Sequence, residues 1–204
     1  FTFDLFAGVV NKDLNGVLGN FMSRVLKMTA SKIGNTVPTS GAWTDLEKEL
    51  VHNLQEHIDL YFKYFKELEF RKALAELRAV WVEGNNYITA SEPWTVIKEN
   101  PERAGAILNV CINLIRIFAL LTFPIMPQTS ENMLSRLNLK IDEHNGLKDF
   151  NVSNKEIIEI LKSKLGVSYN HMTSLKTHEL DLIFNHYTKK FEVEDFKDYF
   201  DISD

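Results

Sequence analysis

The sequence predicts an all-α protein, in which an antiparallel bundle of about five helices in residues 1–139 is followed by a small helical module. Apolar residues recur at three- and four-residue steps over long segments, which is typical of helices with one buried face. Prolines and glycines separate these segments by mostly short loops, which favours antiparallel neighbours. Residues 1–139 contain no stretch with the alternating pattern of a half-buried strand.

The first predicted helix runs from about Val9 to Ile33, after a short apolar lead-in at residues 3–6. Gly34 and Asn35 follow it and can adopt the left-handed conformation that closes a helix. The apolar residues of this helix predict a single buried face made of Leu14, Val17, Leu18, Phe21, Val25 and Met28.

Two places in the sequence carry candidate binding residues. Asn20 and Arg24 lie four residues apart, so they project from the same side of the first helix, one turn apart. Such a pair is usually a solvated face, but it can also offer an amide and a forked cation to one ligand. Pro93 disfavours helix for the residue before it, so the chain turns and leaves Trp94 at a helix end. Trp94 is either a core residue or a platform for an unpaired base.

The second predicted helix runs from Trp43 to about Phe65. Thr44 and Glu47 have the spacing of a capping box at its start. His52 and His57 are five residues apart, which does not place them on one helical face, so we predict no metal site there. The buried stripe is predicted to contain Leu46, Leu50, Leu54, His57 or Ile58, Tyr61 and Phe65.

The third predicted helix runs from Phe70 to Ala90. Arg78 lies beside its apolar stripe and is predicted to be solvated rather than to reach a nucleic-acid backbone. Asn85 and Tyr87 are predicted to be buried and to fix the turn before Pro93 by hydrogen bonds. The residues expected to face the core are Phe70, Leu74, Leu77, Trp81 and Ile88.

A single helical turn at residues 95–99 leads to the fourth predicted helix. Residues 102–122 are apolar on most sides, which predicts a central buried helix. Arg116 is an exception that needs a carboxylate or a helix-end carbonyl as partner, and Cys111 is predicted to be an inert core residue. Residues 126–137 form the fifth predicted helix.

Charge and composition narrow the classes of function. Residues 1–140 hold 15 basic and 15 acidic side chains, and the net charge of −5 comes from the residues after Phe191. A neutral domain suits the reading of a few unpaired bases better than the gripping of many phosphates. No run of eighteen apolar residues predicts a membrane span. The first residues lack a secretory signal and there is one cysteine, which favours a cytoplasmic location.

Five motifs occur in order along the bundle: Asn11-x-Asp13-Leu14, Leu18-Gly19-Asn20-x-x-Ser23-Arg24, Phe70-x-x-Ala73-Leu74, Asn85-x-Tyr87 with Pro93-Trp94, and Asn113-Leu114-x-Arg116 with Phe123-Pro124-x-Met126-Pro127. In these motifs, residues from about 6 to 139 resemble the C-terminal anticodon-binding domain of bacterial methionyl-tRNA synthetases. The resemblance implies that the CAU anticodon is contacted by Asn20, Arg24 and Trp94. Asn85, Tyr87 and Pro93 are predicted to support these residues from their place in the sequence. The family often has a basic residue where this chain has Asn86.

The resemblance implies no chemistry within this sequence. Neither of the family's catalytic signatures, the His-Ile-Gly-His-like and Lys-Met-Ser-Lys-Ser-like motifs, is present, so no catalytic residue, metal or cofactor is predicted. ATP and methionine would bind an absent catalytic half. The implied partners are the initiator and elongator methionine tRNAs and that catalytic domain, with no membrane, no DNA and no indicated oligomer. The alternative is a protein-interaction scaffold, or a natural or engineered fusion, without RNA-reading activity.

The last third of the chain is predicted to differ from the bundle. Residues 140–150 are expected to form a linker, residues 151–191 a small helical module, and residues 192–204 an acidic tail. The pattern Lys-Glu-Ile-Ile followed by Asn-His-Met in residues 155–175 resembles the small N-terminal module of bacterial translation initiation factor two. That resemblance, over about residues 151–190, implies contact with other translation components.

Overall fold

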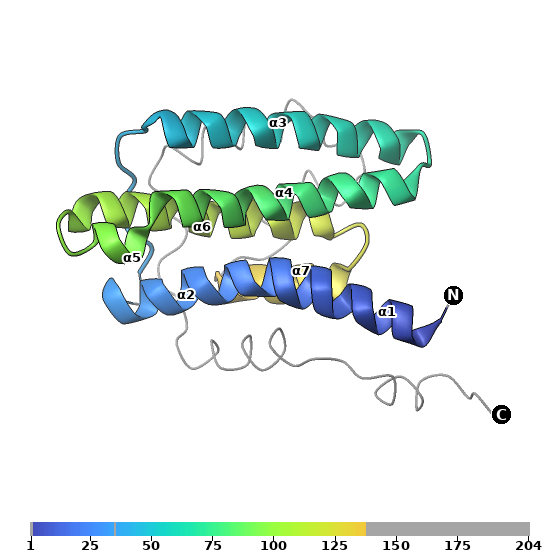
Figure 1. The fold of residues 1–204 in the computed structure, drawn as a ribbon, viewed down its shortest axis with the longest axis horizontal. Coiled ribbons are helices and arrows are strands. Elements are labelled where there is room, and N and C mark those ends of the chain that lie inside the picture. The colour runs from blue at the N-terminus through green and yellow to red at the C-terminus, as the bar shows by residue number, and fades with distance from the viewer. Residues whose placement is uncertain (1, 35, 138–204) are drawn as a thin grey trace.

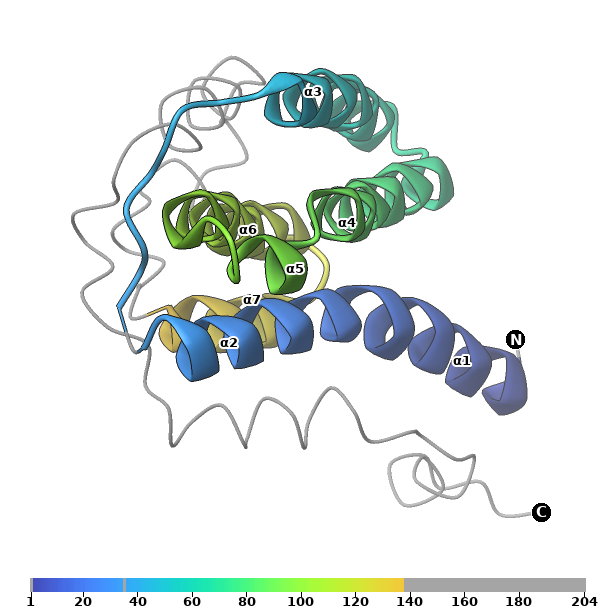
Figure 2. The same ribbon diagram turned by 60° about the vertical axis from the view of Figure 1, so that its left-hand side comes forward.

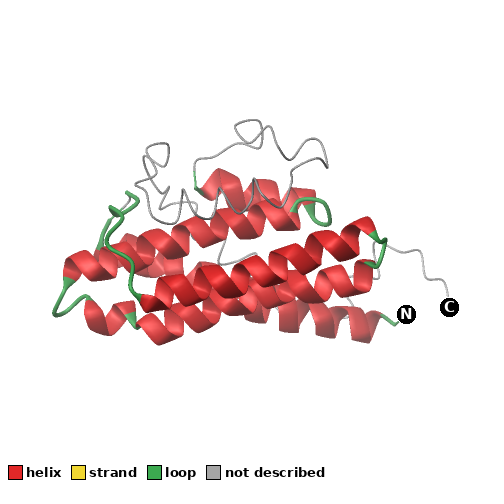
Figure 3. Ribbon diagram, turned by 90° about the horizontal axis from the view of Figure 1, so that it is seen from above, coloured by secondary structure: helices red, strands yellow, loops and turns green. Residues whose placement is uncertain are grey.

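A computed structural model describes residues 2–34 and 36–137, and these residues form helices joined by loops, with no strand among them (Figure 1, Figure 3). This arrangement confirms the predicted all-α bundle. The predicted linker, helical module and acidic tail lie outside the described residues. The elements are α1 (Phe3–Val9), the π-helical stretch η1 (Val10–Gly19), α2 (Asn20–Lys32), α3 (Asp45–Lys66), α4 (Phe70–Ser91), α5 (Pro93–Val96), α6 (Pro101–Thr122) and α7 (Pro127–Arg136).

The helices are arranged in three layers (Figure 2). α3 forms one outer layer, α4 and α6 lie side by side in the middle, and the rod made by α1, η1 and α2 lies with α7 on the other side. Short connections join α3 to α4 and α6 to α7, so the members of each pair run antiparallel. The turn between α4 and the one-turn helix α5 lies beside α2 (Figure 1). Trp94 of α5 is therefore close to Arg24 of α2.

Helix α6 is the centre of the core, as predicted. Every residue from Ala104 to Thr122 is buried, including Arg116. Its length and composition alone would suit a membrane span, but the most apolar window is completely buried in the bundle. The apolar composition is therefore explained by the central position of the helix. Cys111 is fully buried there, and burial raises the pKa of its thiol, which agrees with an inert core residue.

Three predictions about the helices were wrong. Leu46 does not belong to the buried stripe of α3, since it is 37% exposed. Residues 3–6 are not a lead-in: they form the start of α1, where the Thr2 hydroxyl accepts a hydrogen bond from the Leu5 backbone amide at 3.2 Å. Phe70 and Leu74 do not face the core, since they are 50% and 45% exposed. They instead line an open apolar depression at the end of the bundle, next to the loop between α6 and α7.

Gly84 marks a close approach of α4 to its neighbours. A Cβ atom built on Gly84 would lie 2.7 Å from Cζ of Phe118 and 3.1 Å from Cε2 of Phe21. We expect Gly84→Ala to lower the free energy of unfolding by about 1–2 kcal/mol, because the two rings must shift within a packed core. This cost exceeds the roughly 0.5–1 kcal/mol that alanine gains over glycine in a helix. Denaturant unfolding measures the difference. Gly8→Ala is the control, since a Cβ there meets nothing within 4 Å, and equal stability of the two variants would contradict the prediction.

Candidate nucleic-acid interface

Helices α2 and α4 meet through two pairs of polar side chains, one helical turn apart. The Asn20 Nδ2 donates to the Asn85 Oδ1 at 3.3 Å. The two terminal nitrogens of Arg24 donate to the Thr89 hydroxyl at 3.3 and 3.4 Å. Both helices supply residues spaced by four, so the side chains of each lie on one face. We call these two contacts, Asn20–Asn85 and Arg24–Thr89, the interhelical ladder.

Two further hydrogen bonds hold the side chain of Asn85, one to η1 and one within α4. Its Nδ2 donates to the backbone carbonyls of Val17 and Trp81, both at 3.1 Å, which leaves its Oδ1 directed at Asn20. Val17 belongs to η1, the π-helical stretch that ends immediately before Asn20. The amide of Asn85 therefore fixes the position of the first helix at the point where α2 begins. This is a contact between helices, not with the turn before Pro93 as the sequence suggested.

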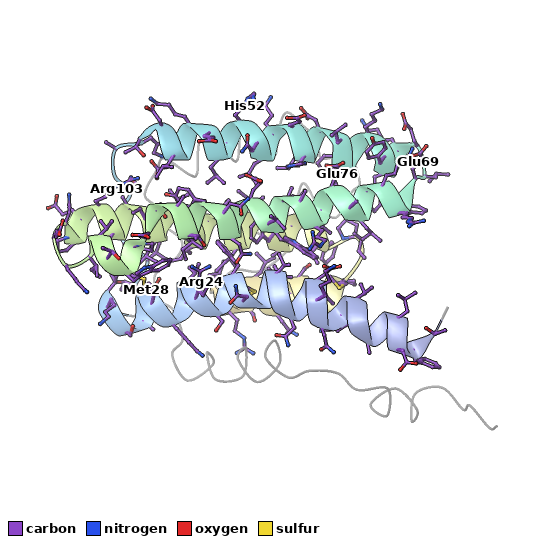
Figure 4. All side chains as sticks on the ribbon, in the orientation of Figure 1. Arg24, Met28, His52, Glu69, Glu76 and Arg103 are labelled. Carbon is purple, nitrogen blue, oxygen red and sulfur yellow. The ribbon has the colours of Figure 1, made fainter. Side chains whose placement is uncertain are left out.

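Trp94 lies on the surface at the start of α5. Glu92 adopts a left-handed conformation with φ of 41°, and the buried Pro93 then occupies the first position of the short helix. This turn leaves Trp94 41% exposed, so Trp94 is not a core residue. The guanidinium carbon of Arg24 lies 5.1 Å from the centroid of the ring, within the range of a cation–π contact. Figure 4 shows Arg24 between α2 and the α4–α5 region.

A cleft of about 480 Å³ opens between α2 and α4. Its size falls in the range of small-molecule sites, and its wall combines amide, guanidinium and hydroxyl groups with small apolar side chains. Trp94 adjoins it through Arg24. The structure therefore brings Asn20, Arg24 and Trp94 to one open surface. The residues that line the cleft are Gly16, Val17, Asn20, Arg24, Val82, Asn85, Asn86, Thr89 and Ala90.

Tyr87 lies away from the cleft, on the opposite side of α4. It is buried, and its hydroxyl donates to the Glu47 Oε1 at the start of α3. Burial, together with the neighbouring Glu47 carboxylate, raises the pKa of Tyr87. Tyr87 thus ties α4 to α3 and supports the cleft only through the placement of α4.

The buried Glu47 carboxylate accepts hydrogen bonds from three residues, Thr44, Tyr87 and Arg103, which together with it form a polar cluster. Its Oε2 accepts the backbone amide and the hydroxyl of Thr44, each at 2.7 Å, which confirms the predicted capping box. Its Oε1 accepts Arg103 Nη2 at 2.7 Å as well as the Tyr87 hydroxyl. The cluster joins the starts of α3 and α6 to the end of α4. Burial acts to raise the pKa of Glu47, but the hydrogen bonds from Arg103, Tyr87 and Thr44 outweigh it and hold the pKa below its ordinary value of 4.5.

The lowered pKa of Glu47 makes stability depend on pH in a defined direction. A depressed folded-state pKa contributes stability that is present above the unfolded value and is lost as pH falls through the folded value. We therefore expect Glu47→Gln to be less stable than the natural chain at pH 7, and the gap to narrow as pH falls below about 4.5. Urea unfolding of both chains from pH 7 to pH 3 measures the gap. A gap that stays constant over this range would contradict the prediction.

The remaining polar predictions have mixed outcomes. Arg78 is not simply solvated, because its Nε donates to the Asp13 carboxylate of η1 at 2.6 Å. The Nδ1 of His57 lies 2.8 Å from the Glu76 carboxylate of α4, across the helix pair. The described residues contain no group of three or more metal-binding side chains. The contact of Thr89 with Arg24 was not predicted from the sequence, although Thr89 follows Asn85 by four residues, as Arg24 follows Asn20.

Comparison with known proteins identifies the family of the chain. The sequence profile of a family described as the anticodon binding domain of methionyl tRNA ligase matches residues 37–181. This range includes Asn85 and Trp94, begins after Asn20 and Arg24, and continues past residue 139, where the sequence suggested that the bundle ends.

Individual relatives give the same result. A methionine–tRNA ligase from Cereibacter sphaeroides is 44% identical over 137 residues, which is 67% of this chain and 24% of that protein. A methionine–tRNA ligase from a Ruegeria species is 42% identical over the same length and shares. The chain thus spans about a quarter of the length of these relatives. A structure of Mycobacterium tuberculosis methionyl-tRNA synthetase with methionyl-adenylate matches with a TM-score of 0.64 and 25% identity, over 69% of this chain and 28% of that one. The family profile covers most of the chain, so this chain belongs to the family of the anticodon-binding domain of methionyl-tRNA ligase.

Proposed function

We propose that this chain reads the CAU anticodon of methionine tRNA through the cleft between α2 and α4. In this proposal Trp94 stacks on an unpaired anticodon base, while Asn20 and Arg24 form hydrogen bonds with base edges. The observation that supports it best is the arrangement of these three side chains on one open surface, with Trp94 41% exposed.

The contact between Asn20 and Asn85 suits an exchange with RNA. Its length of 3.3 Å exceeds the usual 2.9–3.0 Å of an N–H···O bond, so it is weak and a base edge can replace it at small cost. A wrong base would leave the amide of Asn20 or the guanidinium of Arg24 without a partner in a partly desolvated cleft. The penalty for such an unsatisfied group is the physical basis of discrimination.

The ligase reaction is a second part of the proposal. We infer that methionyl-tRNA formation from ATP and methionine takes place in a catalytic part outside these residues, since the relatives are about four times longer than their match to this chain. The described residues would then serve the enzyme by holding initiator and elongator methionine tRNAs at the anticodon, in the cytoplasm. The equal numbers of basic and acidic groups in residues 1–140 fit binding by a few bases.

Binding of two RNA hairpins to the chain tests this function. We expect a stem-loop with a CAU anticodon to bind more tightly than one with a scrambled loop. Asn20→Ala should weaken CAU binding by about 2- to 10-fold, because one base-edge hydrogen bond is lost. Asn132→Ala on α7 is the control, since Asn132 is exposed and lies outside the cleft. Equal binding of the two hairpins, repeated with full-length tRNA, would instead favour the protein-interaction scaffold.

A further inference from the structure

We propose that Thr89 is a positioning residue for Arg24, and that its hydroxyl sets how sharply the cleft distinguishes the correct anticodon. This inference rests on the proposed reading of the anticodon. The sequence alone predicts no role for Thr89. In the structure Thr89 contacts Arg24, the side chain that is proposed to bind RNA.

Arg24 needs a fixed partner because its side chain is long. A free arginine side chain loses about 2 kcal/mol of rotamer entropy when it is held in one geometry. In the structure two contacts hold the guanidinium: the Thr89 hydroxyl on α4 and the Trp94 ring on α5. Among the described residues, no carboxylate forms an ion pair with Arg24. Within the residues that the structure describes, neutral groups therefore place the guanidinium before RNA arrives.

The nature of the Thr89 contact leaves Arg24 able to bind a second group. A guanidinium carries five N–H donors, and the Thr89 oxygen accepts one from each terminal nitrogen, which leaves three. A hydroxyl has no net charge, so it orients the guanidinium without cancelling the charge that strengthens a hydrogen bond to a base. Thr89 is exposed, and both Thr89 and Arg24 line the cleft, so the oriented guanidinium forms part of its wall.

The C-terminal end of α4 positions both groups that contact Arg24. Thr89 lies in the last turn of α4, and Trp94 follows the left-handed Glu92 that ends this helix. Asn85, one turn earlier, anchors the same stretch of α4 to the Val17 carbonyl. Arg24 is thus positioned against a rigid element, which is the arrangement that reduces the entropy cost of binding.

Threonine variants of the full chain test the proposal. Thr89→Val keeps the shape and removes the hydroxyl, and Thr89→Ser keeps the hydroxyl. We expect Thr89→Val to weaken CAU hairpin binding by about 2- to 10-fold, and Thr89→Ser to bind like the natural chain. In an Arg24→Ala background, Thr89→Val should have no further effect. Thr39→Val is the control, since Thr39 is exposed in the loop before α3.

A second measurement on the RNA-free chain separates failure of this inference from failure of the proposed function. The Nε–H signal of Arg24 in a ¹⁵N–¹H spectrum, identified by its loss in Arg24→Lys, should shift or broaden in Thr89→Val and stay in place in Thr89→Ser. An unchanged signal would overturn the positioning role whatever the RNA binding. So would a Thr89→Val effect of equal size with and without Arg24, because that result would mean a direct contact of Thr89 with RNA. A changed signal without CAU preference would leave the positioning intact and overturn the function.

Discussion

Replacing Glu47 with alanine is expected to lower the free energy of unfolding by about 3–5 kcal/mol, the usual cost of removing one partner from a buried ion pair. Glu47 is only 1% exposed and accepts hydrogen bonds from Arg103, Tyr87 and Thr44. Its loss removes the carboxylate partner of the Arg103 guanidinium and the acceptor of the buried Tyr87 hydroxyl, and it removes the capping box of α3. Chemical denaturation at pH 7, where the carboxylate is ionised, measures the change.

The neighbouring Glu49 provides the matched control. It lies two residues further along α3, is exposed, and should change stability by no more than about 0.5 kcal/mol when replaced by alanine. A loss of less than about 1 kcal/mol in Glu47→Ala would mean that the cluster rearranges around the missing carboxylate. Because the cluster fixes the end of α4, a large loss should also weaken RNA binding at temperatures near the unfolding transition of the variant.

The main helices could be predicted from the sequence because their signals are local. The capping box at Thr44, the proline that starts α6 and the apolar surface of α6 each depend on residues close together in the chain. The exposure of Phe70 and Leu74 could not be predicted in the same way. Their spacing is that of a buried stripe, but the first turns of α4 lie at an end of the bundle where the stripe borders an open depression. Burial depends on which elements cover a face, and periodicity does not contain that information.

The residues of the candidate site could also be predicted only in part from the sequence. Helical spacing and the turn at Pro93 identify Asn20, Arg24 and Trp94 as candidates, and the resemblance gives them a role at the anticodon. The structure places them on one surface. Their partners were harder to find. Asn85 was expected to stabilise a turn but bonds to another helix, and Thr89 was not selected at all. Both contacts with α2 span 65 residues of sequence, and nothing in the sequence states which turn of α4 faces α2.

Trp94→Ala is expected to have the largest effect on RNA binding. Loss of a stacking platform costs roughly 1–3 kcal/mol, which corresponds to about a 5- to 150-fold weaker affinity for the CAU hairpin. Trp94 is 41% exposed on the one-turn helix α5, so we expect a smaller change in the free energy of unfolding than for a fully buried tryptophan, and unfolding of each variant should be measured alongside binding. Trp94→Phe keeps an aromatic face and should retain most of the affinity, whereas Trp94→Leu keeps bulk without a π-face and should not.

Binding of both hairpins must be measured for Trp94→Ala, because the ratio of the two affinities shows whether Trp94 contributes to the preference for CAU. Stacking alone tolerates any base, so it cannot by itself produce a preference for CAU. The preference arises if the stacked base is held in register with Asn20 and Arg24, whose guanidinium also lies against the Trp94 ring. Trp94→Ala should therefore reduce CAU binding more than binding of the scrambled loop and bring the two affinities together. If a folded Trp94→Ala chain still prefers CAU by the natural factor, the base is held elsewhere, and the cleft between α2 and α4 is not where the anticodon is read.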